Sequence, residues 1–267
     1  MPEPSVDTVF GDLQQEGEEL DALVSSAAPS DWARPTPAPG WTVAHQIAHL
    51  EWTDRAALLS LTDQEGFAAH VQDALAVPES FVDEGAAAGA KLPPAELLQR
   101  WRDGRLALTR ACRQAPPGER FPWYGPPMKA LSMASARLME TWAHGQDVAD
   151  ALNVRRQPTA RLRHVARIGV RARDYAYLVR GLPAPEREFR VELTAPDGAD
   201  TWTYGPPEAD QRVTGPALDF CLLVTQRAHR ADLAVRAEGH DADRWLDIAQ
   251  AFAGPPGAGR EALGGPR

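Results

Sequence analysis

Two segments of this 267-residue chain combine helical periodicity with residue types that bind metal ions. The first, WTVAHQIAHL, places His49 between apolar neighbours, and the second, MASARLMETWAHGQD, carries Glu140 and His144. Because Glu140 and His144 are four residues apart, they share one helix face and are separated by about 6 Å along its axis. Burying such groups among apolar residues is costly unless they are paired or bound to a metal. The pattern therefore favours a helical fold with Glu140 and His144 on one helix face, and the spacing does not decide whether His49 meets them.

Two imidazoles and one carboxylate are the ligand set of an open metal site, with positions left for water and substrate. Zinc is the default ion for such ligands when no redox chemistry is required. The same side chains also fit the facial triad of non-haem iron, and iron and nickel stay open as alternatives. The competing interpretation is that His49 is an ordinary helix residue and that Glu140 and His144 form a common pair on a solvated face.

The apolar periodicity predicts a mainly α fold, in which an N-terminal four-helix bundle precedes a small α+β domain. We expect the bundle at 1–157, the α+β part at 158–254 with a linking helix at 159–180, and a flexible tail at 255–267. Helices in the bundle are expected at 5–26, 42–59, 63–78, 95–112 and 128–152, whereas the Ala/Gly-rich stretch 77–89 is expected to be mobile. The loop that contains Trp123 and Tyr124 is a candidate lid.

The pattern of apolar residues changes after the linking helix. Alternating apolar residues around a PDG turn predict a β-hairpin at 188–205, and a third strand is expected at 212–214. A helix at 216–229, a strand at 231–239 and a last helix at 241–252 complete the expected α+β part.

The composition excludes several classes of function. The net charge is −9 and the arginines are scattered, which argues against nucleic-acid binding. No apolar run approaches 18 residues, so we expect no membrane span, and the acidic N-terminal segment lacks the features of a secretory signal. Cys112 and Cys221 lie far apart outside any CxxC pattern, so we interpret them as buried small hydrophobes in a reducing cytoplasm.

The two helical segments resemble the two motifs of the DinB-like metal-binding superfamily, and more closely those of the actinobacterial mycothiol-dependent maleylpyruvate isomerase family. The histidine of the first motif matches His49. The second motif, Glu-x-x-x-His with an aspartate three residues on, matches Glu140, His144 and Asp147. The resemblance implies a zinc-type divalent metal and mycothiol as a thiol cosubstrate. Asp147 would accept a hydrogen bond from a ligand imidazole and so orient its ring, unless it is an ordinary solvated acidic residue of the helix.

Two further residues are candidates for catalysis. The segment RVTGPALDFCLLVTQR resembles a part of the family's C-terminal domain in which an arginine near a helix end faces the active site, and the match is Arg227. Arg227 would pair with a substrate carboxylate, unless it is a surface arginine. Many relatives carry aspartate where this chain has His45, one turn before His49. His45 would donate a hydrogen bond to a metal ligand, act as an acid/base or be a fourth nitrogen ligand, unless it is a hydrogen-bonded helix histidine.

These observations predict an isomerase or S-transferase that uses a divalent metal and mycothiol. It would act on a small electrophile, often one that bears a carboxylate, through a metal-bound thiolate. One alternative is a thiol-independent metalloenzyme, either a hydrolase or lyase with metal-bound water or a non-haem iron oxygenase. Another is a metal-binding stress or storage protein without catalysis. The expected partners are small molecules, and the chain is expected to be a monomer or homodimer.

Overall fold

The computed structural model describes residues 6–257 and 259–264, which form two compact units. One unit ends at Arg156 and the other begins at Gln157. Each unit is described by itself below. Among the described residues, no helix is both long enough and apolar enough to cross a membrane.

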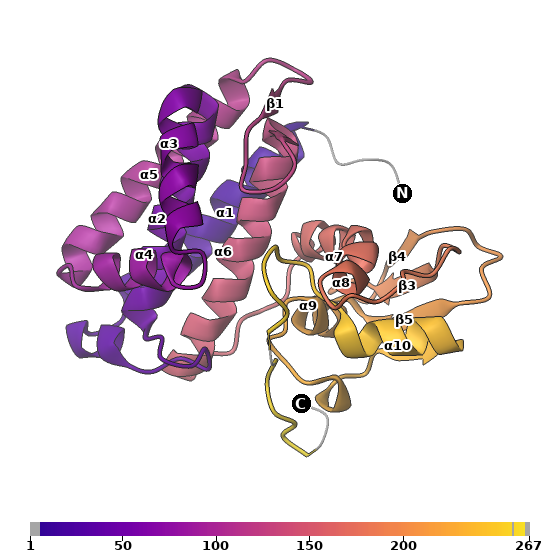
Figure 1. Ribbon diagram of the computed structural model, residues 1–267. Coiled ribbons are helices and arrows are strands. Elements are labelled where there is room, and N and C mark those ends of the chain that lie inside the picture. The colour runs from indigo at the N-terminus through magenta and orange to yellow at the C-terminus, as the bar shows by residue number, and fades with distance from the viewer. Residues whose placement is uncertain (1–5, 258, 265–267) are drawn as a thin grey trace. The chain divides into compact units, whose positions relative to one another are not determined.

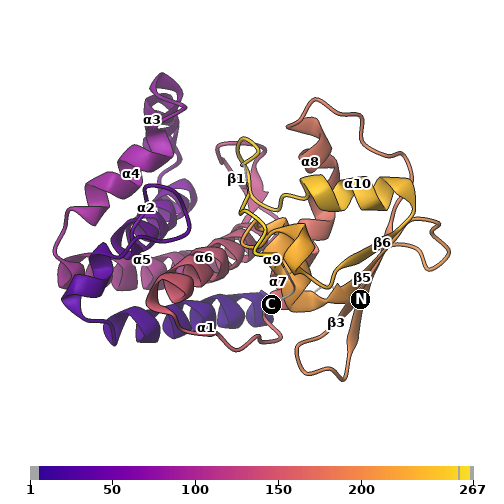
Figure 2. The ribbon, with the colours of Figure 1, turned by 90° about the horizontal axis from the view of Figure 1, so that it is seen from below.

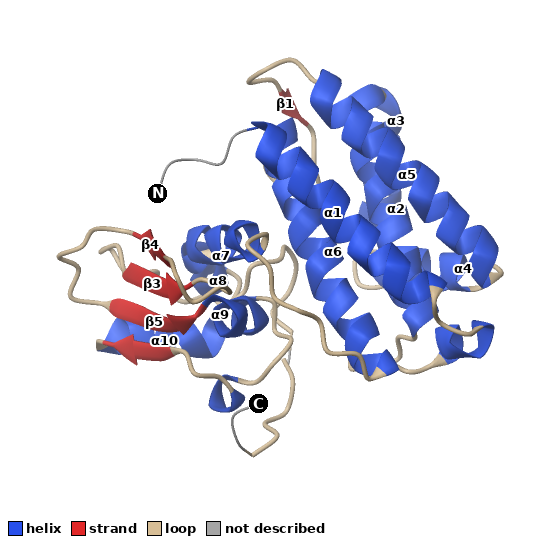
Figure 3. Cartoon of the chain, turned by 180° about the vertical axis from the view of Figure 1, so that it is seen from behind, coloured by secondary structure: helices blue, strands red, loops and turns tan. Residues whose placement is uncertain are grey.

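The N-terminal unit is built on long helices, as Figures 1 and 3 show. These are α1 (Val6–Ser25), α2 (Val43–Thr62), α5 (Pro94–Gln114) and α6 (Ala130–Leu152). Helix α2 packs against α5 and α6, and α1 packs against α6 and α5. The shorter elements are a 3-10 turn (Pro29–Ala33), α3 (Gln64–Ala76), α4 (Phe81–Ala90), β1 (Arg120–Phe121) and β2 (Met128–Lys129). The predicted four-helix arrangement is confirmed.

The core of this unit is formed by the apolar stripes of its long helices. Residues with almost no exposure come from α1, α2, α5 and α6, among them Leu20, Ile47, Leu50, Leu97 and Val148. Burial of each large aliphatic side chain contributes about 1.5–3 kcal/mol, so packing rather than helix propensity holds the elements together. The backbone of α2 is thereby anchored on both sides of His49.

The stretch 77–89, expected to be mobile, is instead largely helical and forms most of α4, which packs on α2. Its small residues allow a close approach. A Cβ atom at Gly89 would lie 2.8 Å from the Cβ of Ala48, and one at Gly85 would lie 3.0 Å from the Trp52 ring. The Ala/Gly composition therefore reflects tight helix packing rather than mobility. Figure 2 shows α4 beside α2.

The C-terminal unit is a small α+β fold, as predicted. Its sheet has the strand order β4-β3-β5-β6, in which β3 (Arg190–Thr194) pairs antiparallel with β4 (Thr201–Tyr204) and parallel with β5 (Arg212–Pro216). Strand β6 (Arg236–Glu238) is antiparallel to β5 and shorter than expected. The predicted hairpin and third strand are confirmed.

The helices of this unit are shorter than the periodicity predicted. The expected helix 159–180 is divided at Ala172 into α7 (Leu162–Arg171) and α8 (Arg173–Leu178), and α10 covers His240–Ile248. Helix α9 (Ala217–Val224) ends five residues before the expected end at 229. It stops because Gln226 adopts a left-handed conformation with φ 58°, which turns the chain away from the helix.

Candidate metal centre

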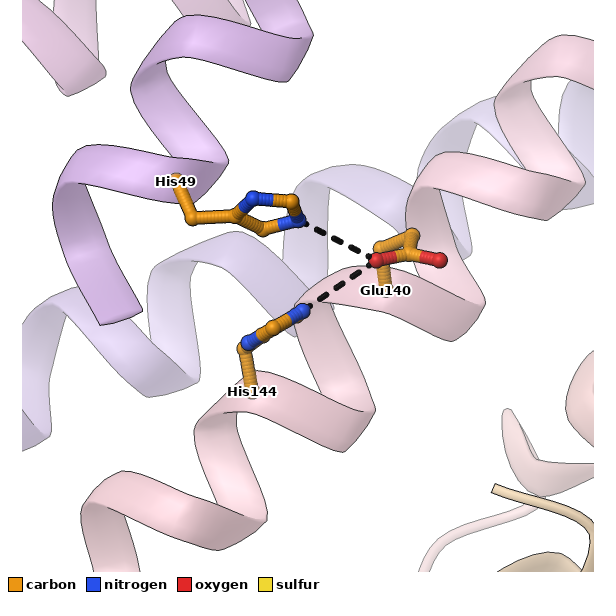
Figure 4. A group of neighbouring side chains, drawn as sticks. All are labelled: His49, Glu140 and His144. Atoms are coloured by element: carbon orange, nitrogen blue, oxygen red, sulfur yellow. Dashed lines mark hydrogen bonds and ion pairs between the residues drawn. The ribbon is translucent and has the colours of Figure 1, made fainter. Parts of the chain in front are cut away.

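The structure brings His49, Glu140 and His144 together inside the N-terminal unit (Figure 4). Helix α2 supplies His49, and α6 supplies the other two. Nε2 of His49 lies 3.5 Å from Oε2 of Glu140, and Nε2 of His144 lies 3.2 Å from the same oxygen. One potential ligand atom from each residue lies within 4.8 Å of the others, and the described residues offer no other such group.

These separations fit a metal ion. Four ligands at bond lengths of about 2.0–2.2 Å around a tetrahedral ion are about 3.3–3.6 Å from one another. The two nitrogen–oxygen distances of 3.5 and 3.2 Å are close to that range. With three protein ligands, coordination positions remain for water or a substrate group. The donor set suits zinc and also suits iron.

The electrostatics of the cluster keep Glu140 ionised. Burial alone would raise the pKa of this carboxyl group, but hydrogen bonds from His144 and His49, and the charges of those rings, lower the pKa of Glu140 well below its usual range. The residue is therefore a carboxylate under ordinary conditions, which is the form that binds a cation.

Gln46 is a member of the site that the sequence analysis missed. It lies on α2 one turn before His49 and is fully buried. Its Oε1 atom is 2.5 Å from Nδ1 of His144 on α6. A metal-binding histidine usually donates its second ring N–H to such an acceptor, which fixes the orientation of the ring. The only sequence signal was a glutamine within the otherwise apolar stretch QIAHL.

Two tryptophans enclose the imidazoles. The Trp41 ring is stacked on His144, with centroids 5.9 Å apart and an interplanar angle of 22°, and its centroid is 5.4 Å from that of His49. The indole N–H of Trp41 donates to Asp83 of α4 at 2.9 Å. Trp52, whose centroid is 6.2 Å from that of His49, packs against α4. Aromatic surface on two sides restricts water around the cluster, which strengthens its electrostatic interactions.

A buried ion pair joins the two ligand-bearing helices. Arg137 of α6 donates from Nε to Oδ1 of Asp54 on α2 at 2.8 Å, and the two side chains are only 3% and 5% exposed. Trp101 of α5 donates to the other carboxylate oxygen at 3.2 Å. Arg137 lies three residues before Glu140, and Asp54 lies five residues after His49. The pair therefore fixes α2 and α6 relative to each other about one turn from the ligands.

The remaining predicted site residues lie in different surroundings. Nδ1 of His45 is 2.8 Å from Oγ1 of Thr42 and accepts from the Thr42 backbone N–H at 3.3 Å, at the first turn of α2. His45 lies outside the group able to hold one ion.

Asp147 is buried on α6, one turn after His144. Arg227 belongs to the C-terminal unit, where it follows the end of α9 and donates to the carbonyl of Thr225 at 2.7 Å. The roles of these three residues stay predictions.

The loop that was expected to act as a lid is held on α3. The Trp123 ring is stacked on Phe67, with centroids 5.7 Å apart and an interplanar angle of 7°. The Tyr124 hydroxyl is 2.5 Å from Nε2 of His70, a histidine to which the sequence analysis gave no role. Burial lowers the pKa of His70, with a smaller contribution from Arg55, and this favours the neutral ring.

Comparisons with known proteins give family models and relatives that match this chain. A family model described as the mycothiol maleylpyruvate isomerase N-terminal domain matches residues 13–149, and a model described as wyosine base formation matches residues 185–238. The uncharacterized protein Rv0036c of Mycobacterium tuberculosis (strain H37Rv) is 57% identical over 249 residues, which cover 93% of this chain and 96% of that protein. Its counterpart MT0041 in strain CDC 1551 has the same identity and coverage.

Solved structures show the same fold. The crystal structure of the mycothiol-dependent maleylpyruvate isomerase has a TM-score of 0.57 at 17% identity, and the match covers 88% of this chain and 93% of that chain. A histidine-to-alanine mutant of that isomerase has a TM-score of 0.58, with the same identity and coverage.

The fold and the cluster define a helical-bundle protein with an open candidate metal centre between two of its helices. The chain belongs to the mycothiol-dependent maleylpyruvate isomerase family, which is a family of enzymes. The resemblance noted in the sequence is thus confirmed.

Proposed function

We propose that this protein is a divalent-metal-dependent isomerase or S-transferase that uses mycothiol and acts on a small electrophile, often one that bears a carboxylate. The observation that carries the proposal is the cluster of His49, Glu140 and His144 within a chain of this family. Zinc is the ion we favour, because the ligands are those of zinc sites and the reaction requires no redox change.

The residues of the cluster have separate tasks in this proposal. His49 and His144 would offer Nε2 lone pairs to the ion, and Glu140 would offer a carboxylate that offsets part of its charge. When bound, the metal supplies positive charge that lowers the pKa of a thiol and so activates it as a nucleophile. The rings of Trp41 and Trp52 limit the access of water to the imidazoles.

The remaining steps follow from ordinary thiol chemistry. Addition of the thiolate to an activated double bond leaves a single bond that can rotate, and loss of the thiolate then gives the isomer and restores the thiol. If the carbanion formed by the addition takes up a proton before the thiolate is lost, the product is a stable thioether. In both cases we propose that Arg227 pairs with the substrate carboxylate through two N–H groups.

The alternatives are less well supported. A storage protein would have a closed site, for instance with His45 as a fourth ligand, but His45 lies outside the group able to hold one ion. The thiol-independent alternatives share the metal centre but have no support from the family, whose description names mycothiol. We also propose that the protein is located in a reducing cytoplasm, since both of its cysteines are free and buried.

Two measurements test the proposal. Metal analysis of the purified protein beside a His49→Ala variant tests the ligand assignment, and unchanged metal content in the variant would refute it. Thermal denaturation with millimolar mycothiol, with and without zinc, tests the thiol. A cosubstrate present at 100 times its dissociation constant stabilises the folded state by about 2.7 kcal/mol, so a melting temperature that does not rise refutes the use of mycothiol.

A further inference from the structure

We propose that Gln46, together with Thr36, holds a proton on Nδ1 of the His144 ring and so leaves Nε2 as the nitrogen available to a metal ion. Gln46 is in this view a positioning residue for one ligand. The inference rests on the proposed metal centre, but the His144 tautomer is measured in the metal-free protein. It depends on a chain of hydrogen bonds whose direction is set at one end.

The direction of these hydrogen bonds is set by the backbone carbonyl oxygen of Trp41, which can only accept. Oγ1 of Thr36 lies 3.0 Å from this oxygen, so the single hydroxyl proton of Thr36 points to it. The backbone N–H of Thr36 donates to the same carbonyl at 2.8 Å. Towards Gln46 the Thr36 hydroxyl therefore has only a lone pair to offer.

The amide of Gln46 is oriented by this lone pair. Its Nε2 is 2.9 Å from Oγ1 of Thr36 and donates to it. The amide oxygen then faces His144, 2.5 Å from Nδ1, and an amide oxygen can only accept. Nδ1 of His144 must consequently carry a proton. Because Gln46 is fully buried, no exposed water competes for either end of the amide.

The consequence is that Nδ1 of His144 keeps its proton, whether or not Nε2 also donates to Oε2 of Glu140 at 3.2 Å. Nε2 is therefore the ring nitrogen that can exchange its proton for a cation held against the Glu140 carboxylate. The ring is therefore set for metal binding before the ion arrives. The same relay holds the loop before α2, which places Trp41 on the His144 ring.

His49 differs from His144 in this respect. Its Nδ1 atom is buried and has no hydrogen-bond partner among the described residues. No acceptor comparable to the Gln46 amide therefore holds a proton on Nδ1 of His49. We infer that the two imidazoles are unequal: the His144 ring is held at both nitrogens, whereas the His49 ring is held only through Nε2, which lies 3.5 Å from Oε2 of Glu140.

The test is a tautomer measurement on the full-length protein. Histidines are labelled with nitrogen-15, the metal is removed with a chelator, and long-range proton–nitrogen spectra are recorded at mildly alkaline pH. The His144→Gln and His49→Gln variants assign the signals. We expect Nδ1 of His144 to carry the proton in the wild type and to share it with Nε2 in Gln46→Leu.

A second measurement connects the tautomer with binding. In a competition titration of zinc against a chromogenic chelator, we expect Gln46→Leu to bind zinc about 10–100-fold more weakly, as is typical for loss of such a partner. Gln46→Glu keeps an acceptor and should stay within a few-fold of the wild type. Gln99→Leu, on the exposed face of α5, is the matched control and should not change the affinity.

Several outcomes would overturn the inference. A wild-type His144 that carries no proton on Nδ1 refutes it directly, and so does a Gln46→Leu protein whose His144 tautomer is unchanged. If Gln46→Leu does not fold, Thr36→Val removes the acceptor that orients the amide, and an unchanged tautomer there has the same meaning. If the wild type binds no zinc, the proposed function fails, whereas the tautomer measurement still decides this inference.

Discussion

The buried pair of Asp54 and Arg137 permits a quantitative prediction for the variant Asp54→Asn. Asparagine keeps an oxygen for the Trp101 indole N–H but loses the negative charge that faces Arg137. The guanidinium group, with its side chain only 3% exposed, would then be an uncompensated buried charge. Such losses cost about 3–5 kcal/mol, so we expect the free energy of unfolding to fall by that amount.

The double variant Asp54→Leu/Arg137→Met should behave differently. Even in the native pair, Nη2 of Arg137 is buried without a hydrogen-bond partner among the residues that the structure describes. The attraction between the two charges therefore does not fully offset the free energy lost when both groups leave water. Replacing both members of such a pair with apolar residues of similar volume is often neutral or stabilising. We therefore expect the double variant to be more stable than Asp54→Asn, although the Trp101 indole N–H loses its partner at a cost of about 1–3 kcal/mol.

The assay is urea denaturation of the metal-free proteins, followed by circular dichroism and analysed by linear extrapolation. The metal-free state separates fold stability from ligand binding. A loss below about 1 kcal/mol in Asp54→Asn would mean that water reaches Arg137, since exposed pairs are worth no more than that. A double variant less stable than Asp54→Asn would equally refute the reasoning.

Three further predictions concern single residues. Glu140→Gln removes the anionic ligand, so the purified protein should contain well under one equivalent of metal by elemental analysis, while its far-ultraviolet spectrum is unchanged. Burial, with a smaller contribution from the charge of Asp54, raises the pKa of Cys112 to about 12; iodoacetamide at mildly alkaline pH should therefore label it only after denaturation, and labelling of the native protein would contradict this. Burial alone would raise the pKa of Asp21, but hydrogen bonds from Arg102 and a serine, and nearby guanidinium charges, lower it overall. Because the pKa of Asp21 is lower in the folded protein than the unfolded value near 4, the ionised carboxylate stabilises the fold above about pH 4. This contribution is lost as pH falls through the native pKa. The acid-induced loss of stability should therefore be smaller in Asp21→Asn than in the wild type.

The tertiary structure changes the interpretation of the stretch before α5. Read as composition, Ala and Gly at 77–89 indicate mobility, because neither residue type contributes a large side chain to a core. In the structure, Gly85 and Gly89 allow α4 to approach Trp52 and Ala48 closely. Whether a small residue serves flexibility or close packing depends on the element opposite it, and that element is distant in the sequence.

The end of α9 illustrates the same limit at a smaller scale. The apolar pattern from 216 onward continues past the observed end, so periodicity alone predicts a helix to 229. The chain instead turns at Gln226, and the N–H groups of Gln226 and Arg227 satisfy the carbonyls of Leu223 and Leu222 at 2.9 and 2.8 Å. Nothing marks this turn in the sequence, because glutamine is not a typical residue for a left-handed cap.

What the sequence determined by itself was the mainly α architecture and the three candidate ligands, since both depend on spacing along a helix. The four-residue step from Glu140 to His144 places two donors on one face whatever surrounds them. Only the tertiary structure decided that His49, 91 residues before Glu140, meets them, and that Gln46 stands behind His144. Contacts between α2 and α6 depend on how the two helices pack, and local periodicity does not encode that packing.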